Sequence, residues 1–292
     1  MSIATLGNID VAKVKQFGTN IMHLVQQKGS RLRNTVFNKS NVIGEETSEE
    51  QLGSQTAKKK TTRNSDTPIT AAEFNRRWCT LFDYEVAKLH DKQDQLKMIV
   101  DPTSSYVQGG AWALTRAMDD EIIAAASGTA RTGKAGAGSE TLPAAQKVVV
   151  GTSGLTLAKL LAAKEILDAN ETDPDEERTC VVTSKQVTNL LNTTEIKSAD
   201  YNSVKALSAG QINTFLGFNF VRTEKLLKDG SSNRLVICYQ KSGIMLAIAQ
   251  DLTVDVGPRR DKSMAKQVYL SLGIGSVRME EEKIVEVACS ES

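Results

Sequence analysis

The most conspicuous chemical motif in the chain is a glycine–lysine spacing typical of nucleotide-binding loops. Gly128, Gly133 and Lys134 match G-x-x-x-x-G-K, in which backbone amides and the lysine cradle phosphate groups. That use requires a preceding strand, a following helix and a Ser or Thr after the lysine to hold Mg²⁺. Here a helical pattern precedes Gly128, Ala135 replaces the hydroxyl, and glycines and a proline follow. A P-loop-like nucleotide hydrolase therefore stays only an alternative interpretation.

Other reactive residue types are not arranged as a catalytic centre. His90 stands beside Asp91, which could orient an imidazole, but neither His90 nor His23 has a nucleophile signature near it. Asp119 and Asp120 are adjacent, and consecutive positions on a helix point in different directions. We expect no catalytic residues and no cofactor, and hence a protein that is not an enzyme.

Metal binding is equally unsupported by the spacing of possible ligands. The four cysteines lie far apart without a C-x-x-C pair, which excludes a recognisable zinc site and favours reduced thiols in a cytoplasm. The acidic turn at 170–177 lacks the spacing and the glycine of an EF-hand. The glutamates at 280–282 are typical of a solvated turn. The cysteines are Cys79, Cys180, Cys238 and Cys289.

Composition sets broad limits on the class of protein. The 292 residues are 40% hydrophobic and 24% charged, which is ordinary for a globular protein, and they suffice for one large domain or two. The formal net charge of +1 argues against a dedicated nucleic-acid binder, which would carry a basic excess. No apolar run reaches the length of a membrane span, and the first residues lack a signal-peptide core.

The segment 34–72 carries the charges best placed to recognise a partner. It is polar and poor in large apolar residues, so it cannot build a core of its own. Its acidic part is separated from its basic part, a pattern that suits docking onto complementary patches of a neighbouring copy. The candidate inter-subunit contacts are Glu45, Glu46, Glu49, Glu50, Lys58, Lys59, Lys60 and Arg63.

The first 33 residues form a basic segment with weak helical patterning. Five basic residues stand against one acidic residue, Asp10, which gives this segment a net charge of +4. An arm lying on anionic nucleic acid and a solvated helix face both fit, and the interspersed charges favour the solvated face. The possible lumen- or DNA-facing residues are Lys13, Lys15, Lys28, Arg31 and Arg33.

One long helix is the element around which these segments must be positioned. Asp101 and Pro102 suit its N-cap and first position, and Gly128 suits its end. Apolar residues recur at intervals of three and four and leave Asp119 and Asp120 on the polar side. The stripe consists of Val107, Ala111, Leu114, Met118, Ile122 and Ala125.

The rest of the chain alternates shorter strands and helices. Alternating residues predict a strand over 76–86 with one buried face, followed by a short helix over 87–100. Helices are also expected at 157–170 and 184–191. Further strands are expected at 146–150, 179–183, 208–223, 234–239, 244–249, 252–256, 268–277 and 284–288, with a turn at Asp229-Gly230 suggesting a hairpin.

The order of these parts resembles the major capsid (coat) proteins of tailed double-stranded DNA bacteriophages, especially podophages. DPTS at 101–104 leading to RAMDD at 116–120 is similar to the start of that family's spine helix. GQI at 210–212 with FLGF at 215–218 is similar to a turn and strand of its axial domain, and GIGSVR at 273–278 to its final peripheral strand. The resemblance covers most of the chain and lies in the order and spacing of these stretches.

The resemblance implies an α+β, Hong Kong 97-type fold. Its expected parts are an N-terminal arm (1–33), an extended loop (34–72), a peripheral domain (73–178) with the spine helix at 102–127, an axial domain (179–254), and peripheral return strands (255–292). The expected function is a structural shell protein that self-assembles as hexamers and pentamers into an icosahedral capsid around double-stranded DNA.

The resemblance also implies partners and a location. We expect the virion capsid, with synthesis and assembly in the host bacterial cytoplasm. The chain begins directly with the arm, which implies a separate scaffolding protein; a portal and a decoration protein are further partners, with only non-specific proximity to packaged DNA and no membrane. An encapsulin-type compartment shell and a basic-armed nucleic-acid-binding protein are alternatives. A cross-link through Lys58, Lys59 or Lys60 has no assignable catalytic carboxylate.

Overall fold

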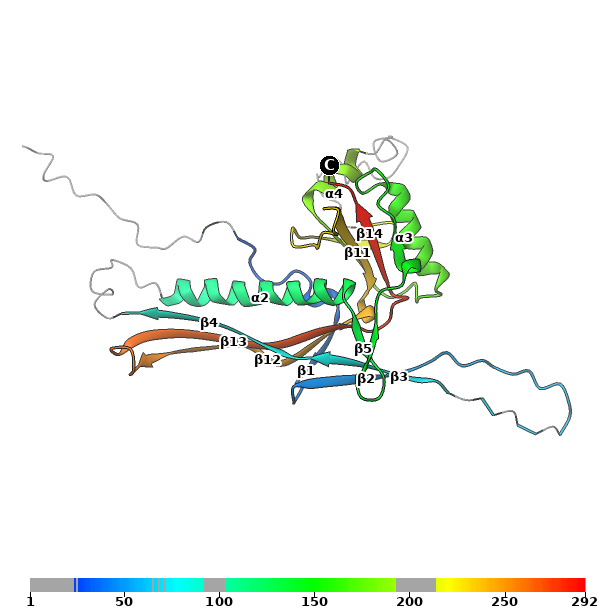
Figure 1. Ribbon diagram of the computed structural model, residues 1–292, viewed down its shortest axis with the longest axis horizontal. Helices are drawn as coiled ribbons and strands as arrows, with labels where there is room; N and C mark the ends of the chain where they lie inside the picture. The colour runs from blue at the N-terminus through cyan, green and yellow to red at the C-terminus, as the bar shows by residue number, and fades with distance from the viewer. Residues whose placement is uncertain are drawn as a thin grey trace, which may run out of the picture.

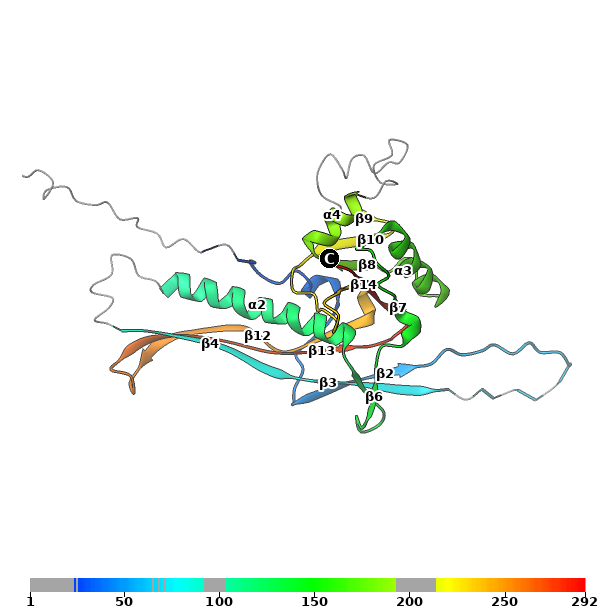
Figure 2. The same cartoon turned by 45° about the horizontal axis from the view of Figure 1, so that its top comes forward.

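The computed structural model describes residues 24, 26–64, 66, 67, 69, 70, 72–91, 103–192 and 214–291. These residues form three β-sheets, one long helix and two shorter helices, which is the expected α+β class (Figures 1 and 2). Within them, no helix combines the length and the apolar character that crossing a membrane requires.

The longest helix, α2 (Thr103–Ser127), lies along a four-stranded sheet (Figure 1). Its buried side chains include Leu114, Met118 and Ile122, three members of the expected stripe. The helix expected over 102–127 is therefore present, whereas Asp101 and Pro102 lie outside the described residues. The strand order of this sheet is β1 (Phe37–Ser40), β12 (Ile244–Arg259), β13 (Ala265–Arg278) and β4 (Phe82–His90).

A six-stranded sheet stands beside one end of α2 and carries the two shorter helices, α3 (Leu157–Ala169) and α4 (Ser184–Asn192) (Figure 2). Every residue of its strand β8 (Arg178–Val182) is buried, which includes Arg178 through its ion pair with Asp168. Thr156 caps α3 by accepting a hydrogen bond from the Lys159 backbone. The strand order is β7 (Lys147–Val148), β14 (Ile284–Cys289), β11 (Arg234–Gln240), β8 (Arg178–Val182), β10 (Phe218–Arg222) and β9 (Thr214–Phe215).

The third sheet supports a long projection. Its strands β2 (Glu46–Leu52) and β3 (Phe74–Thr80) pair antiparallel from Glu46↔Thr80 to Leu52↔Phe74, and the described residues between them extend away from the body in both views (Figures 1 and 2). The described residues between 53 and 73 are all exposed. The strand order is β2 (Glu46–Leu52), β3 (Phe74–Thr80), β5 (Ala130–Thr132) and β6 (Gly138–Glu140).

One apolar core joins α2 to the first two sheets. Met118 of α2, Leu270 of β13 and Ile237 of β11 belong to the same cluster of fully buried side chains. A smaller cluster, which includes Cys79 and Val277, lies where β3 meets β12 and β13. The connections include three short 3₁₀ helices, η2 (Arg33–Thr35), η3 (Ala144–Gln146) and η4 (Lys241–Gly243).

The single strand expected over 76–86 is wrong in two respects. The chain breaks at Leu81 into β3 and β4, which belong to different sheets. In β3 the buried side chains are Arg77 and Cys79, whereas the expected inward residue Trp78 is half-buried. Alternation alone could not show this, because Arg77 is buried through ion pairs rather than through apolar character.

The helix expected over 87–100 is wrong where it can be compared. Residues 87–90 continue β4, which pairs with β13 as far as His90↔Lys266, and residues 92–100 lie outside the described residues. A nine-residue antiparallel ladder outweighs a modest helical propensity.

Several other expected strands are present with different bounds or neighbours. The strands expected at 244–249 and 252–256 form one strand, β12, with irregular register near Gln250. The region 146–150 contributes only the two-residue β7. The Asp229-Gly230 turn exists, but the strand before it is a single bridge at Lys228, because β10 pairs with β8 instead. Within 208–223, residues 208–213 lie outside the described residues.

The last two strands diverge into different sheets. β13 pairs with β12 and β4, whereas β14 pairs with β11 and β7 in the six-stranded sheet. The turn between them therefore ties the two sheets together. The division into arm, extended loop, peripheral and axial domains stays a prediction.

Candidate functional site

The acidic half of the loop segment is held within its own chain. Glu46 forms an ion pair with Arg131, and the Arg131 hydrogen bond holds the pKa of Glu46 below its usual range. Glu49 forms an ion pair with Lys39 of β1. Glu50 pairs with Arg76 on the neighbouring strand, and Glu45, the fourth acidic candidate, has an exposed side chain.

The basic half of the loop segment has a different environment. Lys58, Lys59, Lys60 and Arg63 are all exposed, and none of them forms an ion pair with another described residue. The charge segregation seen in the sequence thus becomes a spatial separation, with the glutamates bound at the base and the lysines out on the projection.

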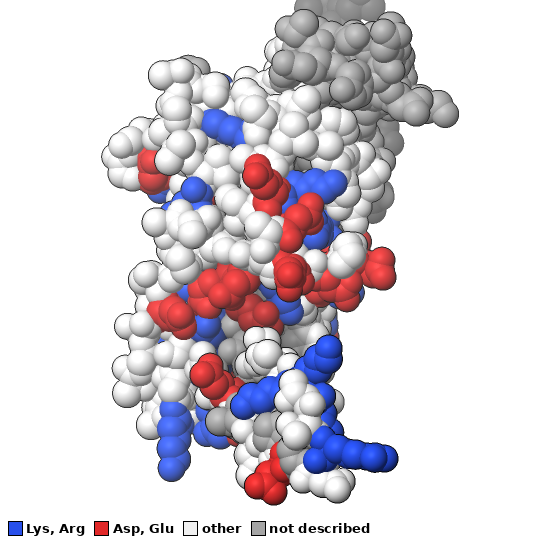
Figure 3. Space-filling model, turned by 90° about the vertical axis from the view of Figure 1, so that its right-hand side faces the viewer, with Lys and Arg blue, Asp and Glu red and all other residues white. Residues whose placement is uncertain are grey.

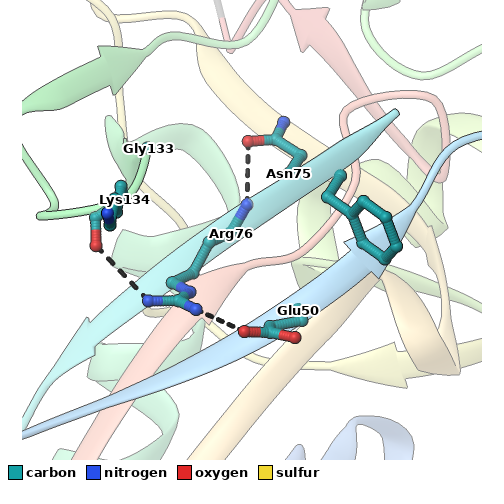
Figure 4. Close-up of a pocket in the computed structure, with 6 residues that line it drawn as sticks. Glu50, Asn75, Arg76, Gly133 and Lys134 are labelled. Carbon is teal, nitrogen blue, oxygen red and sulfur yellow. Dashed lines mark hydrogen bonds and ion pairs between the residues drawn. The ribbon is translucent and has the colours of Figure 1, made fainter. Parts of the chain in front are cut away.

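Two apolar side chains are exposed where the projection leaves the body. Leu52 and Phe74 are directly opposite each other on β2 and β3, and they are 55% and 73% exposed. Phe74 lines a shallow pocket together with Arg76 and Lys134 (Figure 4). Exposed cross-strand apolar pairs of this kind are typical of contact surfaces rather than of a subunit core.

The glycine–lysine motif forms one wall of that pocket but not a phosphate loop. Gly133 has a φ of +86° in the turn between β5 and β6, and its backbone N–H donates to the Arg76 carbonyl at 3.2 Å. Its carbonyl accepts from the Trp78 indole at 2.7 Å. A strand, β6, follows Lys134 instead of a helix. The motif is therefore a turn fastened to β3, and the nucleotide-site interpretation has no structural support.

A buried charge network anchors the base of the projection to the end of α2. Arg278 is fully buried and donates to the carbonyls of Ala126 and Gly128 at 3.3 and 2.5 Å, which satisfies free acceptors at the helix C-terminus. Its Nε donates to Glu281 at 3.1 Å, and Glu281 also pairs with Arg77 of β3. The expectation that residues 280–282 form a solvated run is therefore wrong for Glu281, which two arginines hold inside.

An acidic groove lies beside this network. It runs between the base of the projection and the turn that joins β13 to β14, and Glu171, Asp173, Glu280 and Glu282 are among the residues that line it. Viewed from this side, acidic side chains form a band across the middle of the molecule, above a group of basic side chains (Figure 3). The surface around the loop thus carries both signs of charge in separate zones.

The other charged candidates lie near the arm, and Asp119 fixes the chain where the arm reaches the body. Asp119 is fully buried and accepts hydrogen bonds from the Gln27 amide at 2.6 Å and the Ser30 hydroxyl at 2.5 Å. It also accepts from the backbone N–H groups of Arg31 and Leu32, each at 3.1 Å. Asp119 lies outside the expected apolar stripe and is nevertheless buried, because residues 27–32 cover it.

The basic candidates of the arm that the structure describes have partners within the chain. Lys28 lies 5.5 Å from the centre of the Trp112 ring, and the Arg31 guanidinium donates to the Arg222 carbonyl. Arg33 forms a two-point pair with Asp251 at 2.7 and 3.2 Å, and this pair lowers the pKa of Asp251. Lys13 and Lys15 lie outside the described residues.

Catalytic and metal-binding geometry is not found in the described part of the chain. His90 is buried, and no group of three or more His, Cys, Asp or Glu side chains there could hold a metal ion. Asp119 and Asp120 have different partners, since Asp120 pairs with Lys225 at 2.5 Å. What this surface offers is contact chemistry, with exposed cations, exposed apolar side chains and an acidic groove around a rigidly anchored projection.

Comparison with known proteins identifies the same architecture elsewhere. A family model described as phage capsid protein matches residues 9–291. The capsid structure of the cyanophage P-SCSP1u has a TM-score of 0.77 at 15% identity, covering 100% of this chain and 97% of that chain. The capsid of Ralstonia phage GP4 has a TM-score of 0.72 at 10% identity, with 99% and 97% covered.

A third solved structure is also similar to this chain over almost its whole length. The cyanophage Pam1 capsid asymmetric unit has a TM-score of 0.71 at 12% identity, and 99% of each chain is covered. No curated protein matches this chain in sequence. At these identities the solved structures establish the fold, and the match to the family model extends over nearly the whole chain.

Proposed function

The chain belongs to the phage capsid protein family, and we therefore propose that its copies assemble as hexamers and pentamers into an icosahedral shell around double-stranded DNA. Membership makes the chain a structural protein of the virion capsid and not an enzyme. Rings of five and six copies require heterologous contacts, in which one surface of a copy meets a different surface of the next.

The projection between β2 and β3 is the observation that supports this proposal best. Its described residues are exposed over their whole length, so the subunit gains no core from them. Ordering this segment costs conformational entropy. Because the segment buries little surface within its own subunit, only burial against another surface can offset that cost. The exposed Leu52–Phe74 pair at its base adds apolar area for the same contact.

We assign the inter-subunit charge contacts chiefly to the basic half of the loop. Glu46, Glu49 and Glu50 already have partners within the chain, whereas the four basic residues have none among the described residues. Because every copy also carries the acidic groove, a neighbour offers a surface of opposite charge. Glu45 is exposed and stays a further candidate contact.

We propose that the arm faces the lumen, close to the DNA, without binding it tightly. The described basic residues Lys28, Arg31 and Arg33 have part of their bonding capacity occupied inside the subunit. The net charge of +1 suits a wall that encloses DNA, because strong phosphate binding would hinder packing and release. The proposal also includes a separate scaffolding protein, a portal and assembly in the host bacterial cytoplasm, with a decoration protein as a possible addition.

The alternative functions have less support. The P-loop-like hydrolase lacks the helix that must follow Lys134. The encapsulin-type shell is not supported, because the family model that matches this chain describes phage capsid proteins. A nucleic-acid-binding protein with a basic arm has less support, because the described basic residues of the arm already make contacts within the chain.

Charge reversal at the loop tests the proposed contact. Changing Lys58, Lys59 and Lys60 together to Glu is expected to abolish capsomers and shells in electron micrographs while the circular dichroism spectrum and thermal midpoint of the monomer stay unchanged. The matched control replaces the same lysines with Arg, which keeps the charge, and should assemble normally. Equal loss of folding and assembly would show instead that the loop belongs to the subunit core.

A further inference from the structure

Two buried thiols face each other in the middle of the six-stranded sheet. Cys180 of β8 and Cys238 of β11 are directly opposite in the antiparallel register, and their Sγ atoms are 3.3 Å apart. Both side chains are fully buried. Both are free thiols in this structure.

The Cα spacing of the two strands suits a bond between these sulfurs. Opposed residues of an antiparallel pair have Cα atoms about 4.5–5.5 Å apart, which falls within the range of about 4.4–6.8 Å seen in disulfides. The sulfurs need to approach by only about 1.3 Å to reach the usual S–S length. Rotation of the two side chains, together with a small closing of the two strands, supplies this approach.

We propose that Cys180 and Cys238 are an oxidation site that closes into a disulfide within one subunit. The other two cysteines are not placed for this reaction. Cys289 of β14 lies opposite Arg234 of β11, and its thiol is directed at the Val287 carbonyl. Cys79 belongs to the separate core cluster beside β3. The pairing is therefore specific, although the sheet contains three cysteines.

A small peroxide is the class of oxidant that suits so enclosed a site. One thiolate attacks hydrogen peroxide and becomes a sulfenic acid, releasing hydroxide. The second thiol then displaces the sulfenic hydroxyl, so that the S–S bond forms and water leaves. In sum, two thiols and one peroxide give one disulfide and two waters, and the two electrons pass to the peroxide oxygens.

Burial makes this reaction slow and conditional. It raises the pKa of the Cys180 thiol, which leaves little of the reactive thiolate at neutral pH. The thiols thus survive synthesis in a reducing compartment and respond afterwards to an oxidising environment. The resulting bond would fasten β8, which leads into α4, to β11. The inference concerns the single subunit and does not depend on the proposed assembly.

Peroxide treatment of the folded, unmodified chain tests the inference directly. After treatment the protein is unfolded in the presence of an alkylating reagent, digested and analysed by mass spectrometry without reduction. The expected product is a cross-linked peptide pair containing Cys180 and Cys238, with Cys79 and Cys289 recovered as alkylated thiols. Circular dichroism before and after treatment checks that the fold persists.

Two cysteine variants serve as controls for the identity of the cross-linked pair. Cys289→Ser should form the same cross-link, whereas Cys238→Ala should lose it and leave Cys180 as a thiol or a higher oxide. Four alkylated thiols, under conditions that oxidise the unfolded chain, would overturn the inference. So would a cross-link to Cys289, or independent oxidation of Cys180 and Cys238 to sulfinic acids.

Discussion

Asp119 is the single residue on which the position of the arm most depends. Its carboxylate accepts from two side chains and two backbone N–H groups of the segment 27–32, all within 3.2 Å. A buried carboxylate is tolerated because these donors replace its hydration. Helical periodicity placed Asp119 on a polar face correctly, but it could not reveal that the arm covers that face, since the partners lie about 90 residues away.

Asp119→Asn is expected to destabilise the subunit by about 2–3 kcal/mol. The asparagine side chain replaces one acceptor oxygen with an NH₂ donor, which would face the donors that now bind the carboxylate. Hydrogen exchange at residues 27–32 should accelerate at the same time. Asp120→Asn is the matched control, since its exposed pair with Lys225 is worth at most about 1 kcal/mol. Equal urea midpoints for the two variants would contradict the assigned role.

Glu291 gives the subunit a predictable sensitivity to acid. The Arg234 guanidinium, aided by Lys228 and Gln186, holds the pKa of Glu291 at about 2. A depressed carboxyl pKa stabilises the folded state above the ordinary glutamate pKa, near 4.3, and this contribution is lost as the pH falls toward 2. Because Glu291 lies near the surface, solvent screening keeps this contribution well below the roughly 3 kcal/mol that the full pKa difference would give.

Urea midpoints measured from pH 6 down to about pH 2 test this linkage. The unmodified protein should lose stability more steeply with acid than Glu291→Gln, which should already be less stable at neutral pH. Glu165→Gln, at an exposed position of α3, controls for the change in total charge. Parallel curves for the unmodified protein and Glu291→Gln would exclude the proposed ion pair as the source.

At the scale of elements, local pattern predicted helices better than strand partners. The apolar stripes of α2 and α3 were sufficient to locate both helices, because periodicity of 3.6 over many residues has few alternatives. Two features depend instead on strand partners that are distant in sequence. Residues 87–90 form part of β4 rather than the expected helix, and β13 and β14 belong to different sheets. The same holds for Arg77 and Glu281, whose burial follows from their mutual ion pair.

Gly275 shows how closely two of these elements cross. A Cβ atom at this position of β13 would lie 2.1 Å from the carbonyl oxygen of Thr80, where β3 ends. Gly275→Ala must therefore push the two strands apart, and we expect a loss of about 2–3 kcal/mol in the free energy of unfolding. Gly257→Ala, with no atom within 4 Å of its added Cβ, is the matched control and should change stability by less than about 1 kcal/mol. Similar losses in both variants would mean that propensity, not the crossing, decides the cost.

The whole subunit consists of a body packed around one main core and a projection whose described residues between 53 and 73 are exposed. The network of Arg278, Glu281 and Arg77 links the base of the projection to the end of α2. The polar composition and segregated charges of the loop could be predicted from the sequence, whereas its contact with a neighbouring copy stays a proposal. Which charges stay available could not be predicted, because the partners of Glu46 and Glu49 come from other elements.

Electron cryo-microscopy of the expressed protein, with a scaffolding protein supplied if needed, shows whether this chain builds a shell. We expect closed icosahedral shells whose reconstruction resolves pentamers and hexamers of this chain. Each 53–73 projection should lie against a neighbouring copy, with its lysines toward acidic side chains. A chain that stays monomeric under all assembly conditions, or shells in which the projection folds back onto its own subunit, would refute the proposed assembly.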